Sequence, residues 1–217
     1  MRSRGAQVSC PDLPGLGLDQ TPISKITMKS YVERVCDALV AFQEPAIVVG
    51  HSMGGVVITQ ASEYCSGKIR KLVFLSSYIL KDGETFMKTA PLDVESPGLS
   101  SVIFDRENGT AYFKAEMLKD LLYGDCSDDD ILRARKNLVP NAVAPLEEAM
   151  HLSENGFGRV PKVYITTLHD KIITPAFQKR MYSNTRCEEV IAIESSHSPF
   201  FSKPAELAEI LLSIGKN

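Results

Sequence analysis

The stretch that most constrains this chain runs from Ala46 to Val57 and reads AIVVGHSMGGVV. An apolar run ends at Gly50, and a serine then lies between glycines before the apolar residues resume. This pattern predicts a strand that turns abruptly into a helix, with Ser52 on the turn. Because the β-branched run is unbroken, we expect the strand at 46–50 to be buried on both faces, as in a parallel sheet.

The rest of the chain alternates short apolar runs with helical periodicity. Strands that alternate with helices predict βαβ units, and therefore an α/β fold with a mostly parallel sheet and helices on both faces. We expect further strands at Ala6–Cys10, 71–77, 162–167 and 189–194, and helices at 28–42, 53–64, 175–182 and 204–214.

The alternation stops between residues 80 and 159. Asn108-Gly109 indicates a hairpin turn there, and two helices are expected after it, at 114–122 and 128–138. The acidic cluster after Ser127 is typical of a helix N-cap and first turn, which we favour over a metal site.

We interpret this stretch as a lid inserted between two strands of one domain. The predicted single α/β domain spans 1–217, with a core at 1–79 and 160–217 and the lid at 80–159.

Composition excludes several classes of protein. A chain of 217 residues with 44% hydrophobic residues can bury the core of one domain. A net charge of -3 argues against nucleic acid or an anionic membrane surface as partner. No apolar run approaches the ~20 residues of a membrane span. The cysteines are scattered and odd in number, which predicts free thiols and a cytoplasmic location. They are Cys10, Cys36, Cys65, Cys126 and Cys187.

Residues 50–54 read G-H-S-M-G and match G-x-S-x-G, a strained strand-to-helix turn that exposes a serine oxygen. The residues two before and two after the serine should be small, because they crowd together. The N-terminus of the following helix favours the negative charge that develops during acyl transfer. We therefore predict that Ser52 is a catalytic nucleophile.

A serine hydroxyl needs a base, and the base needs an orienting carboxylate. His169 and His197 each follow a predicted strand, and chemistry collects at the carboxyl ends of parallel strands. The chain order Ser…Asp…His favours His197 as base and Asp170 as acid. Asp82, which follows an earlier strand, is the rival acid.

Six segments spread over the whole chain resemble the α/β-hydrolases of the plant methylesterase and hydroxynitrile lyase type and their bacterial esterase relatives. The segments are PDLPGLG (11–17), GHSMGG (50–55), KLVFLSSY (71–78), LYGDCS (122–127), DKIITPAFQ (170–178) and SSHSPFFSKP (195–204). The resemblance implies Ser52 as nucleophile, Asp170 as acid and His197 as base, with the N–H of Met53 as one oxyanion donor. It also implies a small-molecule ester substrate and no cofactor or metal.

The chain departs from that family in two ways. The hydroxynitrile lyases carry a lysine directly after the catalytic histidine, whereas Ser198 stands here, which disfavours a lyase. Family members also begin with a strand and a His-Gly loop that donates a second oxyanion N–H, and this chain has neither. We therefore expect weak activity, and either low stability or a homodimer formed through the exposed sheet edge.

Two functions remain open at this point. The first is a serine esterase that hydrolyses small to medium carboxylic esters. The second is a hydrolase-fold binding or interaction protein with little or no catalysis.

Overall fold

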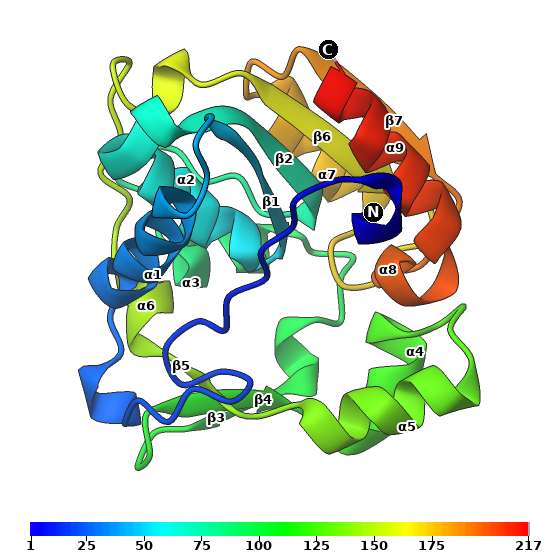
Figure 1. Cartoon of the computed structure of the whole chain (residues 1–217). Coiled ribbons are helices and arrows are strands. Elements are labelled where there is room, and N and C mark those ends of the chain that lie inside the picture. Colours follow the sequence, from blue (N-terminus) through cyan, green and yellow to red (C-terminus); the bar gives the residue numbers. More distant parts are fainter. Residues whose placement is uncertain (217) are drawn as a thin grey trace.

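A four-stranded parallel sheet forms the centre of the molecule, whose computed structural model describes residues 1–216 (Figure 1). The strands lie in the order β1-β2-β6-β7, and each neighbouring pair is parallel. The predicted mostly parallel sheet is therefore confirmed. The strands are β1 (Ala46–Ser52), β2 (Ile69–Ser77), β6 (Lys162–Thr167) and β7 (Glu189–Ile193).

Helices cover both faces of this sheet, as predicted. Alternate residues of β2 point to opposite faces, so Leu72 and Phe74 enter one hydrophobic core while Val73 and Leu75 enter the other. The first core is shared with α1, α2 and α7, and the second with α9. In residues 1–216 no helix has the length and apolar character needed to cross a membrane. These helices are α1 (Met28–Val40), α2 (Gly54–Cys65), α7 (Pro175–Ser183) and α9 (Pro204–Lys216).

Between β2 and β6 the chain forms a separate antiparallel sheet with short helices around it, set apart from the main sheet in Figure 1. The predicted hairpin is confirmed, with Gly109 at φ 64 in its turn. Ser127 caps the next long helix by accepting a hydrogen bond from the N–H of Asp130 at 3.2 Å. That this segment acts as a lid stays a prediction. Its elements are α3 (Phe86–Thr89), β3 (Val102–Asp105), β4 (Thr110–Phe113), α4 (Leu118–Leu122), α5 (Asp128–Asn137), β5 (Asn141–Ala142) and α6 (Ala144–Glu147).

β1 is less buried than its sequence predicts. Within residues 1–216 it pairs with β2 alone and is an edge strand of the sheet. Its other side borders a groove of about 1220 Å³, and Val49 is 41% exposed. The prediction of burial on both faces is wrong, because a β-branched run records apolar character and not the number of neighbouring strands.

The strand predicted at Ala6–Cys10 is also wrong. Within the described chain these residues form no strand pairing. They line the groove together with β1, and the groove separates the two segments. A strand needs a partner about 4.8 Å away to share its hydrogen bonds, and within residues 1–216 no strand pairs with this segment.

Cys36 and Cys65 form a disulfide that joins α1 to α2, with their Cα atoms 5.9 Å apart. The prediction of five free thiols is therefore wrong for this pair, while Cys10, Cys126 and Cys187 are free. The two partners are 29 residues apart in sequence, so only the packing of α1 against α2 brings them together.

Candidate active site

Ser52 is the last residue of β1 and has a positive φ of 55, so the strained turn that the motif predicts is present. A Cβ on Gly50 would lie 2.7 Å from the carbonyl oxygen of Gly54, so this close approach requires glycine. A Cβ on Gly54 would meet open space. The crowding expected on both sides of the serine is therefore found at Gly50 and not at Gly54, which borders the groove.

The turn is attached to the neighbouring strand by its backbone. The carbonyl oxygen of Ser52 accepts hydrogen bonds from the hydroxyl of Ser77 at 2.6 Å and from the N–H of Tyr78 at 3.2 Å. A Cβ on Gly55 would collide with the Ser77 side chain and the Tyr78 carbonyl. Glycine at position 55 therefore lets the start of α2 lie directly against the end of β2.

His197 and Asp170 meet beyond the carboxyl ends of β7 and β6. Nδ1 of His197 lies 2.7 Å from Oδ2 of Asp170, and both residues are buried. The other carboxylate oxygen, Oδ1, accepts the N–H groups of Ile172 at 2.8 Å and Ile173 at 3.0 Å. These bonds hold the carboxylate in one orientation toward the imidazole.

The surroundings of Asp170 favour its ionised form. Burial alone would raise the pKa of this carboxyl group, but the nearby His197 and the hydrogen bonds outweigh burial and lower it below its ordinary value. The carboxylate is therefore charged at neutral pH. A charged carboxylate can orient the imidazole through Nδ1–H and stabilise an imidazolium.

The two rival residues lie elsewhere. His169 is exposed, and its Nε2 lies 2.7 Å from Oε2 of Glu194. Asp82 accepts a hydrogen bond from the N–H of Leu152 at 2.8 Å. Of the carboxylates of Asp82 and Asp170, the one placed beside His197 is therefore that of Asp170.

His51 links the serine turn to the loop that carries His197. Its Nε2 lies 2.7 Å from the carbonyl oxygen of His197, and the two ring centroids are 4.5 Å apart. Burial, together with the charge of His197, lowers the pKa of His51 to about 3. His51 is therefore neutral and donates Nε2–H to that carbonyl. No hydrogen bond joins the Ser52 hydroxyl to His197 within residues 1–216.

Sequence reasoning missed the polar residues that surround Asp170. Ser76, Thr167 and Gln178 all contact its Oδ2 oxygen and are buried. Ser76 and Thr167 are polar residues near the carboxyl ends of the apolar strands β2 and β6. That pattern could have indicated that they lie near the site. Gln178 lies on a helix and gave no such indication.

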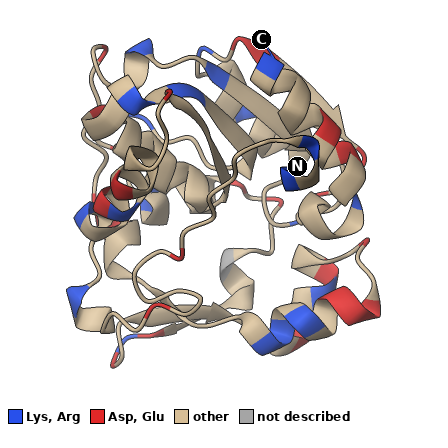
Figure 2. Ribbon diagram, viewed as in Figure 1, with Lys and Arg blue, Asp and Glu red and all other residues tan. Residues whose placement is uncertain are grey.

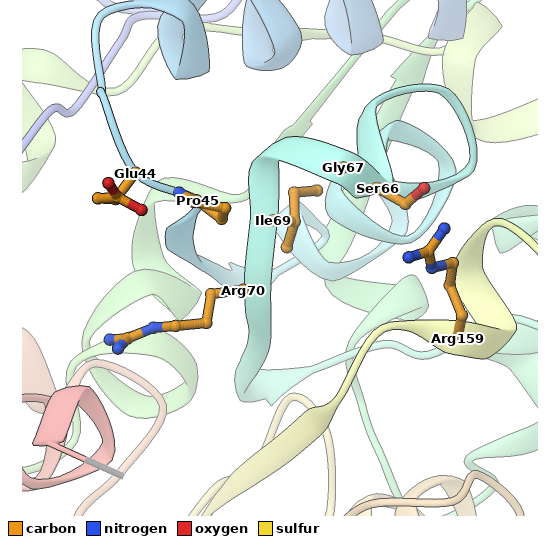
Figure 3. Close-up of a pocket in the computed structure, with 7 residues that line it drawn as sticks. All are labelled: Glu44, Pro45, Ser66, Gly67, Ile69, Arg70 and Arg159. Atoms are coloured by element: carbon orange, nitrogen blue, oxygen red, sulfur yellow. The ribbon is translucent and has the colours of Figure 1, made fainter.

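Cavities border the main sheet within residues 1–216. One, of about 550 Å³, lies at the amino ends of β1 and β2, at the opposite end of the strands from Ser52 (Figure 3). The larger groove reaches the serine turn through Gly50, His51 and Gly54.

No group of metal-ligating side chains occurs within residues 1–216. Figure 2 shows charges of both signs on α1, α5 and α9.

Comparison with known proteins places this chain in a family. The alpha/beta hydrolase family matches residues 1–210. Methylesterase 17 of Arabidopsis thaliana is 31% identical over 228 residues, which cover 98% of this chain and 82% of that protein. The same plant's "Putative methylesterase 11, chloroplastic" is 33% identical over 98% of this chain.

The chain spans only part of some relatives. It covers 57% of that second methylesterase, and 51% and 63% of two others from the same plant. In fold, the solved structure of polyneuridine aldehyde esterase is similar, with a TM-score of 0.89 at 24% identity over 99% of this chain and 90% of that one. The chain thus has the α/β-hydrolase fold and belongs to the alpha/beta hydrolase family, among its methylesterase-type members.

Proposed function

We propose that this chain is a serine esterase that hydrolyses small to medium carboxylic esters. One observation carries the proposal: a buried His197–Asp170 pair lies at the carboxyl end of the sheet. Ser52 stands on a strained turn at the same end, tied to the His197 loop through His51. The names of the related methylesterases make methyl esters the first substrates to test.

In the proposed reaction the Ser52 hydroxyl attacks the ester carbonyl carbon while Nε2 of His197 takes its proton. Asp170 keeps the imidazole in the tautomer with Nδ1–H and stabilises the imidazolium. His197 then protonates the leaving alcohol. Water, activated by the same histidine, releases the acid and regenerates Ser52. The chemistry requires no cofactor.

The oxyanion of the tetrahedral intermediate would be held by the N–H of Met53, at the N-terminus of α2. Loss of one oxyanion donor costs on the order of 3 kcal/mol in activation free energy, so the placement of this N–H matters for the rate. The open groove beside Gly50 and His51 favours the second candidate, a hydrolase-fold binding protein with little turnover.

The cytoplasmic location stays a prediction. Three of the five cysteines are free, as a reducing compartment requires, but Cys36 and Cys65 are bonded. Several of the related methylesterases carry the word chloroplastic in their names.

A panel of p-nitrophenyl and methyl esters tests the proposal on the purified chain. Ser52→Ala, His197→Ala and the double variant should all lose about three or more orders of magnitude of turnover, because nucleophile and base act as a unit. Ser213→Ala removes an exposed hydroxyl on α9 and should leave turnover unchanged. A fluorophosphonate probe should label Ser52.

Two results would contradict the esterase. One is turnover at the parent rate in Ser52→Ala. The other is absence of turnover across the panel, with no probe labelling, while the chain still binds esters or their acids, which would favour the binding protein.

A further inference from the structure

Asp170 is more heavily hydrogen-bonded than the orientation of one imidazole requires. Its Oδ2 oxygen, which accepts from His197, also contacts the hydroxyl of Ser76, that of Thr167 at 3.1 Å and the Nε2 of Gln178 at 3.2 Å. These side chains come from three elements: β2, β6 and α7. The neighbouring strands and a covering helix therefore all converge on one carboxylate oxygen.

The orientation of the Gln178 side-chain amide determines which groups donate and which accept in this cluster. Its Oε1 accepts from the hydroxyl of Thr166 at 2.8 Å and from the N–H of Thr167 at 3.1 Å, which orients the amide. Its Nε2 then donates, to the carbonyl oxygen of Ile173 at 2.7 Å and toward the hydroxyl of Thr167 at 3.1 Å.

Because the Thr167 hydroxyl accepts from Gln178, its own hydrogen is free to point at Ser76. This hydroxyl lies 2.8 Å from the hydroxyl oxygen of Ser76 and donates to it. Nδ1 of His197 lies 3.2 Å from that same oxygen, but it carries the proton directed at Asp170 and cannot accept one. The remaining acceptor for the Ser76 hydrogen is therefore Oδ2 of Asp170.

The backbone at Ser76 supports a specific role for its side chain. Ser76 is fully buried at the carboxyl end of β2 and has a positive φ of 44. Residues other than glycine rarely adopt this conformation, and it persists only where the surrounding structure holds it. Here it places the hydroxyl between the carboxylate of Asp170 and the imidazole of His197.

We propose that Ser76 is a positioning residue of the esterase reaction, one that holds Oδ2 of Asp170 in line with Nδ1 of His197. The inference rests on the proposed function of these two residues. Ser76 acts through Asp170 and does not touch the substrate. Thr167 and Gln178 support it by fixing the direction of its hydroxyl.

Few other groups near the pair change charge over the working pH range. Burial raises the pKa of Tyr78 and of Tyr164, so both stay neutral. His51 has a pKa of about 3 and is neutral as well. The acid limb of a pH profile should therefore report the His197–Asp170 pair. The groups facing the pair are His51, Tyr78 and Tyr164.

Ser76→Ala tests the proposal, with Ser62→Ala as matched control. Ser62 is an equally buried serine, on α2, and its hydroxyl bonds only the carbonyl of Thr59. Loss of a hydrogen bond to a charged group should lower kcat of Ser76→Ala about tenfold or more, with KM unchanged. Because the lost bond favoured the ionised carboxylate, the acid limb of kcat/KM should move to higher pH. The control should keep the parent profile.

Thr167→Val removes the hydroxyl that orients Ser76 while keeping the shape of the side chain. It should move the acid limb in the same direction, because this hydroxyl also lies 3.1 Å from Oδ2 of Asp170. Ser76→Gly removes the Ser76 hydroxyl alone and suits the positive φ at this position, so it decides the matter if Ser76→Ala fails to fold. A purely structural role for Ser76 would lower the stability of Ser76→Ala and Ser76→Gly and leave their acid limbs at the parent pH, which would overturn the proposal.

Proton NMR of the low-field Nδ1–H resonance of His197 separates this inference from the esterase proposal. The resonance should be present in the parent chain and should shift in Ser76→Ala and Thr167→Val but not in Ser62→Ala. If the parent hydrolyses no ester, the esterase proposal fails, while a shifted resonance still supports the contact. An unshifted resonance in both variants would refute the positioning role even in an active enzyme.

Discussion

The two halves of the candidate site are supported very differently. Asp170 and His197 follow β6 and β7 and are buried, and the carboxylate accepts hydrogen bonds at both oxygens. Ser52 ends an edge strand that has one partner and borders a groove of about 1220 Å³. Buried hydrogen bonds therefore fix the positions of the acid and the base, whereas the strand that carries the nucleophile pairs with one neighbouring strand and faces the groove on its other edge.

This contrast shows which contacts the serine turn depends on. Its backbone is tied to β2 through Ser77 and Tyr78, and to the base loop through His51. Every one of these bonds comes from the β2 side of the turn or from the His197 loop. Substitutions at Asp170 and His197 should therefore lower the reaction rate most. Substitutions around β1 should lower the free energy of unfolding where they face β2 and have little effect where they face the groove.

The largest expected effect is on the acid–base side. Asp170→Asn should lower kcat/KM by about 10⁴-fold, because an amide can hold the imidazole in the wrong tautomer. Asp82→Asn is the matched control, since Asp82 bonds the N–H of Leu152 and does not contact His197. Steady-state kinetics on an ester that the parent hydrolyses would measure both variants. Loss of activity in the Asp82 variant alone would move the acid to the earlier strand.

The parts of the fold and site that the sequence predicts correctly lie mostly away from the exposed edge of β1. The order of strands and helices and the turn at Ser52 were predictable, because local periodicity and the glycine pattern determine them. The approach of Asp170 to His197 was predictable from the carboxyl-end rule for parallel sheets. Ser76 was missed although it lies near the end of an apolar strand, because its contact partner Asp170 is 94 residues away in sequence.

The errors gather around β1. Burial of its faces and the pairing of Ala6–Cys10 depend on which strands lie side by side, and local composition does not encode that. The disulfide between Cys36 and Cys65 was missed for the same reason, since it needs α1 packed on α2. That the exposed β1 edge pairs with a second copy of the chain stays a prediction.

The next largest effect should come from the disulfide, which ties together the two helices packed on the β1 side. Reduction, or Cys36→Ser, releases a loop of 29 residues and should lower the free energy of unfolding by about 3–4 kcal/mol. Cys10→Ser removes an exposed free thiol and should change it by about 0.5 kcal/mol or less. Urea unfolding with and without reductant measures both. Equal stability of the reduced and oxidised chain would mean that the bond does not constrain these helices.

A smaller effect is expected from the two glycines that flank the serine turn. Gly50→Ala would place a Cβ 2.7 Å from the backbone of Gly54 and should destabilise the chain by about 2–3 kcal/mol. Gly54→Ala meets open space at the first residue of α2, where alanine is the better helix former, and should be neutral or stabilising by up to about 1 kcal/mol. Thermal melts of the two variants provide the comparison. Similar losses in both would show that the groove beside Gly54 is closed in solution.

The smallest effect comes from the same substitution made on an inner strand, β6, and on the edge strand β1. Val163→Thr puts a hydroxyl into the core at a position with 0% exposure and should cost about 1–2 kcal/mol, because the hydroxyl loses water there. Val49→Thr makes the same change at a position that is 41% exposed, where water from the groove can reach the hydroxyl, and should cost about 0.5 kcal/mol or less. Urea unfolding of the two variants measures the difference directly. If Val49→Thr costs as much as Val163→Thr, then β1 is covered in solution by a second copy of the chain or by another segment. Size-exclusion chromatography at several protein concentrations would then separate those two cases, because only the second copy makes the elution volume depend on concentration.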